Sequence, residues 1–262
     1  MSYETILFAV EHGIARLTFN RPDKLNSFNS KMHAEVREAL SLLAEREARV
    51  LVLTGAGRGF CAGQDLGDRA IAPGSQGVDL GESIEKNYKP LVLALHNLPL
   101  PVIAAVNGVA AGAGANIALA CDLVIAARSA SFVQAFSKLG LLPDSGGTWV
   151  LPRLVGEARA LGLTLLGNKL PAEQAATWGM IWQCVEDAEL GATVDALAQQ
   201  LAIAPTRGLA WTKKAIRGGW QNSLVQQLDI ERDAQRELGY SLDYAEGVAA
   251  FAQKRTPNFK GR

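Results

Sequence analysis

Short apolar runs separated by turn residues fill the first half of the chain. Residues 5–10 and 14–20 are rich in β-branched and apolar side chains with Gly13 between them, which predicts a β-hairpin. Further short apolar runs follow at residues 50–54, 102–106, 123–126 and 131–133. The runs at 50–54 and 102–106 have no polar interruptions, which is typical of strands buried on both faces of a sheet.

Helical spacing of apolar residues predicts a helix over residues 30–46, and the small residues of 110–120 predict a buried one. After Pro152 the chain becomes a succession of expected helices at 156–166, 171–178, 189–202, 206–217 and 224–253, the last broken at Gly239. Alternation of strands and helices indicates βαβ units and an α/β fold. We therefore expect an α/β core over residues 1–200 and a helical region over 201–262. A helical appendage with little core of its own predicts packing against a neighbouring subunit.

Residues 68–81 have a different character. They contain proline, glycine and serine with little periodicity. This composition predicts a mobile loop near the functional site.

Composition narrows the class of protein. The formal net charge of zero and the lack of a basic stripe disfavour nucleic-acid binding. Glu4 and Glu11 interrupt the N-terminal apolar residues, and the longest apolar stretch is too short to span a membrane. The cysteines Cys61, Cys121 and Cys184 are far apart without metal-ligand spacing, so we expect reduced thiols, no metal site and a cytoplasmic location.

Two glycine-rich turns, residues 59–66 and 107–116, follow the two buried strands. Small residues let a backbone approach a ligand closely, and a helix beginning near Gly112 would direct its N–H groups and positive dipole end toward that ligand. One N–H group from each turn could hold the oxyanion that forms when a thioester loses its α-proton, and one such donor contributes about 3 kcal/mol. Ordinary strand-to-helix turns look the same, so both interpretations stay open at this point.

Asp144 lies between Pro143 and a run of small residues. Its residue type favours a helix N-cap. If it instead faces a pocket formed by Leu141, Leu142 and Phe136, the apolar surroundings would make it a usable base.

In their order and spacing, several segments resemble the crotonase, or enoyl-CoA hydratase/isomerase, family over essentially the whole chain. The segments are Asn20-Arg21-Pro22, Leu25-Asn26-Ser27, 59–66, 101–108, Cys121-Asp122, 140–143, Phe251 and 254–259. The resemblance implies a crotonase-like spiral of ββα units, a C-terminal trimerisation region, and a homo-oligomer that is a trimer or a dimer of trimers. It also implies an acyl-CoA thioester as substrate and no cofactor besides the CoA that the substrate carries.

By the same resemblance, the N–H groups of Ala62 and Ala113 would form the oxyanion hole, with Ala113 in place of the glycine usual in the hydratases. The residues implied to bind the substrate and its CoA moiety are Lys24, Leu25, Ala62, Gly63, Gln64, Asp65, Leu66 and Gly112. Lys254 would reach the CoA phosphates from its own or a neighbouring subunit, although the residue by itself is typical of a solvated surface lysine.

The chain departs from the hydratases at their two catalytic glutamates, whose aligned positions hold Asn116 and Phe136. Neither side chain can act as a base at neutral pH, so water addition is disfavoured. Asp144 lies eight residues beyond Phe136, where some isomerases and a dehalogenase of the family place a catalytic aspartate. A single carboxylate fits proton transfer within the substrate.

Residues 57–65, 135–140 and 179–183 are most similar to family members that act on a ring epoxide. The implied reaction converts 2-(1,2-epoxy-1,2-dihydrophenyl)acetyl-CoA to oxepin-CoA in phenylacetate catabolism. The same groups would move a double bond of an enoyl-CoA from position 3 to position 2. The alternatives are an enoyl-CoA hydratase that holds water differently, and a non-catalytic crotonase-fold protein that binds RNA or acts as a scaffold.

Overall fold

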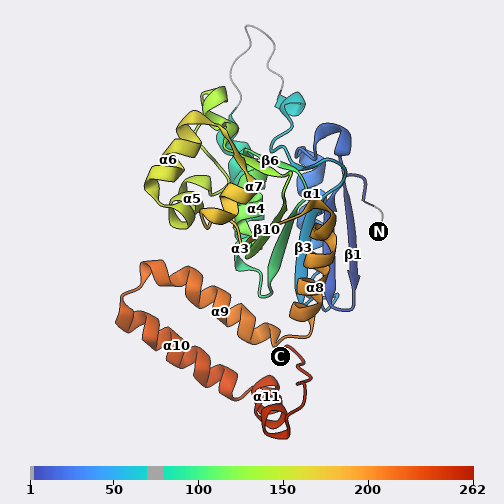
Figure 1. The fold of residues 1–262 in the computed structure, drawn as a ribbon, viewed down its shortest axis with the longest axis vertical. Helices are drawn as coiled ribbons and strands as arrows, with labels where there is room; N and C mark the ends of the chain where they lie inside the picture. Colours follow the sequence, from blue (N-terminus) through green and yellow to red (C-terminus); the bar gives the residue numbers. More distant parts are fainter. Residues whose placement is uncertain (1–2, 70–78) are drawn as a thin grey trace.

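The computed structural model describes residues 3–69 and 79–262, which form a two-sheet α/β core with helices around it (Figure 1). Six strands form the main sheet in the order β1-β2-β3-β5-β7-β10, and four short strands form the second in the order β4-β6-β8-β9. The main-sheet strands are β1 (Ile6–Glu11), β2 (Ile14–Phe19), β3 (Val50–Gly55), β5 (Val102–Val106), β7 (Leu123–Ala127) and β10 (Gln183–Val185). The second sheet contains β4 (Gly59–Cys61), β6 (Val109–Ala111), β8 (Ser131–Val133) and β9 (Lys169–Pro171).

From β3 to β8, consecutive strands alternate between the two sheets. In each of the pairs β3–β4, β5–β6 and β7–β8, the first strand joins the main sheet and the second joins the other sheet. The predicted hairpin is confirmed as the antiparallel pair β1–β2, whereas β2, β3, β5, β7 and β10 run parallel. This arrangement has the expected form of repeated ββα units.

Helices connect and cover these strands. They are α1 (Ser30–Ser41), α2 (Leu80–Ser83), α3 (Lys89–Asn97), α4 (Ala113–Ala120), α5 (Gly147–Val155), α6 (Glu157–Leu166), α7 (Ala172–Thr177), α8 (Leu190–Ala202), α9 (Thr206–Gly218), α10 (Leu224–Gly239) and α11 (Leu242–Gln253). The segment η3 (Ile84–Tyr88) is π-helical. Short 3-10 turns are η1 (Pro22–Lys24), η2 (Leu66–Arg69), η4 (Ala135–Leu139), η5 (Asp187–Glu189) and η6 (Gly219–Gln221). None of the helices in residues 3–69 and 79–262 has both the length and the apolar character that a bilayer span requires.

Two predicted helices are wrong in their bounds. The segment predicted as a helix from residue 110 begins as strand β6, and α4 begins only at Ala113, because Gly112 turns the backbone at a φ of 54°. The helix predicted to residue 46 ends at Ser41, and turns follow it. The break at Gly239 is confirmed, since α10 ends there and Ser241 caps α11 by accepting from the Tyr244 N–H. Of the loop predicted at 68–81, residues 70–78 lie outside the described residues and α2 begins at its end.

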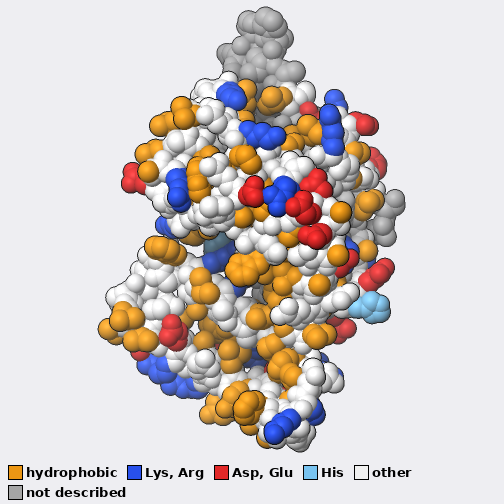
Figure 2. All heavy atoms as spheres, viewed as in Figure 1, with side chains coloured by type: hydrophobic (Ala, Val, Ile, Leu, Met, Phe, Trp, Pro, Cys, Tyr) orange, Lys and Arg blue, Asp and Glu red, His pale blue; other side chains and the backbone are white. Residues whose placement is uncertain are grey.

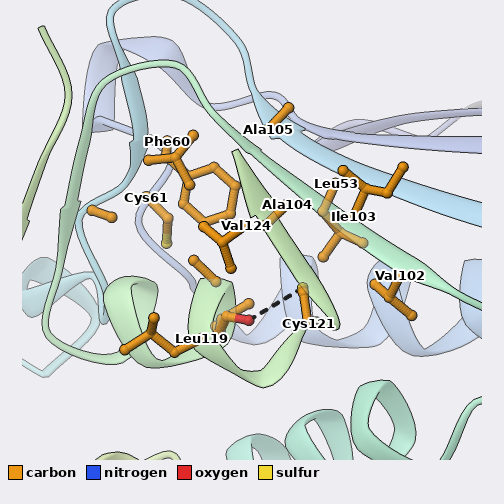
Figure 3. Close-up of a cluster of buried hydrophobic side chains, with 14 of the residues drawn as sticks. Leu53, Phe60, Cys61, Val102, Ile103, Ala104, Ala105, Leu119, Cys121 and Val124 are labelled. Atoms are coloured by element: carbon orange, nitrogen blue, oxygen red, sulfur yellow. Dashed lines mark hydrogen bonds between the residues drawn. The ribbon is translucent and has the colours of Figure 1, made fainter. Parts of the chain in front are cut away.

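The core lies between the parallel strands and the short helix α4. Figure 3 shows Leu53, Ile103 and Val124 of the main sheet beside Phe60 of β4 and Leu119 of α4. All eight residues of α4 are buried, which is typical of a helix that is apolar on every side. Burial of this helix places its N-terminus inside the protein, between the two sheets' connections.

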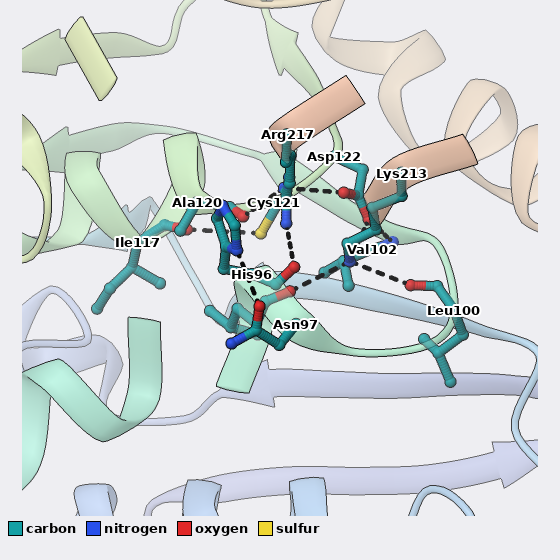
Figure 4. Close-up of polar contacts among 11 residues, drawn as sticks. His96, Asn97, Leu100, Val102, Ile117, Ala120, Cys121, Asp122, Lys213 and Arg217 are labelled. Carbon is teal, nitrogen blue, oxygen red and sulfur yellow. Dashed lines mark hydrogen bonds and ion pairs between the residues drawn. The ribbon is translucent and has the colours of Figure 1, made fainter. Parts of the chain in front are cut away.

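Helices α9–α11, which we call the C-terminal arm, extend from the core in Figure 1. The arm is attached through a cluster of three charged side chains (Figure 4). The Asp122 carboxylate forms ion pairs with Lys213 and Arg217, each at 2.8 Å. It also accepts a hydrogen bond from the Val102 N–H at 2.7 Å. Burial lowers the pKa of Lys213, an effect that the nearby Asp122 carboxylate opposes. Because all three charges are mostly shielded from water, the cluster joins α9 to the core with defined partners.

A second attachment involves Arg49, which precedes β3. Its guanidinium donates to the Ala204 carbonyl at 2.6 Å, to the Thr206 hydroxyl at 3.1 Å, and to the Phe259 carbonyl at 3.1 Å. One side chain therefore holds the beginning of the C-terminal arm and the segment that follows its end.

Candidate active site

The two glycine-rich turns are in direct backbone contact. Gly63 has a φ of 88°, and a Cβ added there would lie 2.9 Å from the Ala111 carbonyl oxygen and 3.2 Å from the Ala113 nitrogen. A Cβ added to Gly114 would overlap the Cys61 carbonyl. Only glycine allows this approach, so the sequence lets the first turn pack against the beginning of α4.

The beginning of α4 provides N–H groups at this contact. Gly112 is the N-cap residue, and its own N–H donates to the Val133 carbonyl at 2.8 Å. The N–H groups of Ala113, Gly114 and Ala115 have no acceptor within the helix, because the first turn of any α-helix lacks them. Together with the helix dipole, they make this end suited to negative charge.

Ala62, the other predicted oxyanion donor, has an intramolecular partner. Its N–H donates to the Leu25 carbonyl at 2.9 Å. Leu25 and Asn26 both have positive φ, and the Asn26 amide fixes this conformation by donating to the carbonyls of Ala56 at 2.9 Å and Gly59 at 2.8 Å. A thioester oxygen would have to share the Ala62 N–H with Leu25 or displace it. The oxyanion role of Ala62 stays a prediction.

Two side chains predicted to bind CoA are engaged within the protein. Gln64 accepts from the Tyr88 hydroxyl at 3.0 Å, and Asp65 forms an ion pair with Arg21 at 2.8 Å. The Arg21 hydrogen bond holds the pKa of Asp65 below its ordinary value. The ion pair fastens the loop that contains Arg21 to the first glycine-rich turn, and the Tyr88 hydrogen bond fastens η3 to it. With these side chains engaged, any contact of the turn with CoA would be made chiefly through its backbone.

This ion pair predicts a pH-dependent contribution to stability. A carboxylate with a lowered pKa stabilises the folded state above its unfolded pKa, which is about 4 for aspartate, and that contribution is lost as the pH falls through the folded value. We therefore expect Asp65→Asn to lower the free energy of unfolding at neutral pH, and the difference from the native protein to shrink below about pH 4. Urea unfolding at pH 7 and pH 3 measures both differences. Equal differences at the two pH values would contradict the assignment.

The remaining predicted CoA residues divide into two distant groups. Lys24 and Leu66 are exposed beside the first turn, with Leu66 58% exposed. Lys254 is exposed and follows α11, which lies at the far end of the molecule from β6 (Figure 1). One chain does not bring Lys24 and Lys254 together, so a shared CoA site would need Lys254 of a second copy.

Asp144 is not a helix N-cap. The N-cap of α5 is Gly146, at a φ of 82°, and no side chain caps the helix, so that interpretation is wrong. The Asp144 carboxylate instead accepts from the Ser145 hydroxyl at 2.9 Å. Its carbonyl accepts from the Gly147 N–H at 2.9 Å and from the Asn116 side-chain amide at 2.8 Å.

Asn116 donates to the Asp144 carbonyl and lies on the same helix as Ala113, the proposed oxyanion donor. It lies three residues after Ala113 on α4, a rise of about 4.5 Å along the axis and less than one turn of helix. The loop that presents Asp144 is therefore attached beside the N-terminus that would hold the oxyanion. From the sequence, Asn116 had no expected role beyond its inability to act as a base. The available signal was that it is the one polar side chain in the buried segment Ala113–Ala120.

A cavity of about 580 Å³ borders this region. Its lining includes Asn116, Ser145, Trp149 of α5 and Ile216 of α9. Phe136 is buried, at 7% exposed, whereas Trp149 and Trp182 are 39% and 68% exposed. The Phe136 ring lies beside Gly112, where an added Cβ would be 3.8 Å from it.

Two other kinds of chemistry find no support in this region. Burial raises the pKa of Cys61, the neighbour of Ala62, to about 12, which keeps the thiol protonated and unsuited to nucleophilic attack near neutral pH. In the described part of the chain, no group of three or more histidine, cysteine or acidic side chains is placed to hold a metal ion.

Comparison with known proteins agrees with this architecture. A family model described as enoyl-CoA hydratase/isomerase matches residues 9–262. The chain is 59% identical to 1,2-epoxyphenylacetyl-CoA isomerase of Escherichia coli (strain K12), over 99% of each chain. It is 50% identical to a probable enoyl-CoA hydratase of Rhodobacter capsulatus, over 100% of each.

A crystal structure of an enoyl-CoA hydratase from Bacillus anthracis is 33% identical and superimposes with a TM-score of 0.92, covering 99% of this chain and 100% of that one. The expected α/β fold of ββα units with a helical C-terminal region is thereby confirmed. The chain belongs to the enoyl-CoA hydratase/isomerase, or crotonase, family.

Proposed function

We propose that this protein is an acyl-CoA isomerase in which Asp144 carries a proton from one carbon of the acyl group to another. One observation carries the proposal: Asn116 fastens the Asp144 loop less than one turn of α4 from the Ala113 N–H. The aligned positions of the two hydratase glutamates, Asn116 and Phe136, offer no second base. The 59% identity to an isomerase supports the same reaction class.

The reaction would proceed through an enolate. The thioester oxygen lies at the N-terminus of α4, where the Ala113 N–H and, after exchange with the Leu25 carbonyl, the Ala62 N–H would donate to it. Asp144 removes the α-proton, and the two donors stabilise the charge that develops on oxygen. Asp144 then returns the proton to a carbon further along. Bonds and protons are only redistributed within the substrate, so no cofactor besides its CoA moiety is required.

The proposed substrate is 2-(1,2-epoxy-1,2-dihydrophenyl)acetyl-CoA, which would give oxepin-CoA. The Escherichia coli relative is named for this class of substrate. Isomerisation of 3-enoyl-CoA to 2-enoyl-CoA uses the same proton transfer.

The test compares three thioesters with the purified protein: the ring epoxide, a 3-enoyl-CoA and crotonyl-CoA. We expect turnover of the first two and little hydration of the third. Hydration of crotonyl-CoA as fast as isomerisation would favour a hydratase, as the name of the Rhodobacter capsulatus relative suggests for that protein. Thioester binding without turnover of any of the three would favour a scaffold.

We also propose a homo-oligomer, a trimer or a dimer of trimers, assembled through the C-terminal arm. The arm presents large apolar side chains to solvent, and Figure 2 shows apolar side chains on its surface. The most exposed are Ile216, Trp220, Leu224, Val225, Tyr240, Leu242 and Phe251, at 65–89%. So many exposed apolar side chains on three successive helices are typical of an interface. A cytoplasmic location stays a prediction.

Phe251 tests this interface because it is 89% exposed in the single chain and lies near Lys254. We expect the native protein to sediment as a trimer or larger, and Phe251→Asp to sediment as a smaller species, because an interface would bury the added charge. Sedimentation velocity measures both. A native protein that sediments as a monomer would overturn the proposal.

A further inference from the structure

We infer that Asn116 is a positioning residue for the proposed base: its side-chain amide holds the Asp144 loop in the orientation that proton transfer requires. The inference rests on the proposed function, in which Asp144 moves the proton. It gives a role to the position that the hydratases fill with glutamate. Asn116 acts here through Asp144 and has no chemical step of its own.

Hydrogen bonds fix the direction of the Asn116 amide. The Asp144 carbonyl oxygen can only accept, so the Asn116 atom 2.8 Å from it must be the donor Nδ2. The Asn116 Oδ1 then faces the opposite way and accepts from the Gln134 Nε2, also at 2.8 Å. The result is a directional chain from Gln134 at the end of β8, through α4, to the backbone of the Asp144 loop. Each member has only one orientation that satisfies its neighbour.

Packing and hydrogen-bond direction make this series of hydrogen bonds specific to asparagine at position 116. Asn116 is completely buried, and a Cβ added to Gly147 would overlap its amide. The absence of a side chain at Gly147 lets this amide reach the Asp144 loop. A carboxylate at position 116 would set one acceptor against another, the Asp144 carbonyl. Asn116 is thus a different solution from the hydratase glutamate, with a donor where the hydratases have a base.

The Asp144 loop needs such an anchor because its backbone is strained. Ser145 has a φ of 50° although it is not glycine, and Gly146 follows at 82°. Such conformations persist only where surrounding contacts hold them, and they concentrate at functional sites. The contacts that hold this loop include the Asn116 amide, the Gly147 N–H and the Ser145 hydroxyl, and the Trp149 and Val150 N–H groups of α5 donate to the Gly146 carbonyl. Among these groups, the Asn116 amide is the one that comes from a distant part of the sequence.

Two substitutions of Asn116 distinguish a role in positioning Asp144 from a role in packing alone. Asn116→Leu keeps the branched shape and the number of side-chain heavy atoms but cannot donate at any pH. We expect kcat for 3-enoyl-CoA isomerisation to fall by about 10- to 100-fold, because small displacements of a reacting group have effects of this size, while KM changes less than threefold. Asn116→Asp can donate only when protonated. Its kcat relative to the native enzyme should therefore rise as the pH is lowered from 8 to 5.

Charged groups near position 116 set the background for this pH profile. The cavity beside position 116 is lined by His96, Asp122, Arg153, Lys213 and Arg217. Asp144 belongs to the loop to which the Asn116 amide donates. These groups are common to the native enzyme and the variant, so the ratio of the two kcat values isolates the new carboxyl group. Thr164→Val is the control for loss of one side-chain bond to a backbone carbonyl, since Thr164 donates to Ala160 at 2.9 Å on α6, and it should leave kcat and the pH profile unchanged.

The outcomes separate this inference from the proposed function when Asp144→Asn is assayed beside them. Loss of activity in Asp144→Asn with native kcat in Asn116→Leu would overturn the positioning role alone. Full activity in Asp144→Asn would overturn the proposed base, and the positioning role with it. If Asn116→Leu does not fold, the pH-dependent ratio of Asn116→Asp decides, and a ratio that stays constant or falls as the pH is lowered counts against the inference.

Discussion

Replacing Asp144 by asparagine is expected to lower kcat for double-bond isomerisation by about 10²- to 10⁴-fold, the usual contribution of a positioned acid–base group. Asparagine has nearly the same shape as aspartate. The bonds that Asn116 and Gly147 make to residue 144 involve its backbone carbonyl, so they persist in the variant. What is lost is the ability to accept a proton from the substrate. Formation of the conjugated 2-enoyl thioester, followed by its ultraviolet absorbance, measures the effect.

A matched control is Asp195→Asn on α8. Asp195 pairs with Arg16, and both side chains are about half exposed, so its loss should have little effect on activity or stability. Binding of a non-reactive acyl-CoA thioester should be nearly unchanged in Asp144→Asn, because Asp144 is not expected to contact CoA. Native kcat in Asp144→Asn would exclude it as the proton carrier.

Gly114→Ala is the second change with a large expected effect. The added methyl group would overlap the Cys61 carbonyl, which belongs to the backbone of the other glycine-rich turn and cannot rotate away. Either the two turns separate or α4 shifts, and both outcomes disturb the N-terminus that would bind the thioester oxygen. We expect a loss of several kcal/mol in unfolding free energy, at the upper end of single substitutions, together with weaker thioester binding.

Gly162→Ala on α6 provides the comparison, because nothing lies within 4 Å of the position where its Cβ would be. Alanine is the better helix former by about 1 kcal/mol, so that variant should be slightly more stable than the native protein. Thermal unfolding and calorimetric binding of an acyl-CoA thioester measure both variants. A Gly114→Ala protein with native stability and affinity would show that the two turns need not touch.

The longer elements of the fold could be predicted from sequence because their patterns are longer than chance would produce. The hairpin β1–β2, the buried strands β3 and β5, and helices α6–α11 follow from apolar spacing and turn residues. Of the second sheet, β8 was expected at residues 131–133, but β4, β6 and β9 were missed, because each has three residues. Such strands have no readable period, and β6 was therefore taken as the first turn of a helix. Helices α2, α3 and α5 were also missed.

The candidate site shows the same limit. Asp144 and the two glycine-rich turns could be singled out from residue types, but their partners depend on contacts between segments far apart in the chain. Neither the bond from the Ala62 N–H to Leu25 nor that from Asn116 to Asp144 follows from spacing. Residue statistics favoured an N-cap at Asp144, and the left-handed turn at Gly146 prevented it by starting α5 two residues later.

The hydrogen bonds of Arg49 to the two ends of the C-terminal arm affect how copies of this chain would associate. Arg49 holds residues at both ends of the arm, and Asp122 holds α9 between them. An arm attached to the core at both ends is a rigid extension of the core and not a flexible one. Much of its conformational entropy is already lost when the chain folds, so association would sacrifice correspondingly less. Subunits with such rigid arms would associate in one geometry. A CoA site completed by Lys254 of a neighbour would then form at the moment of association.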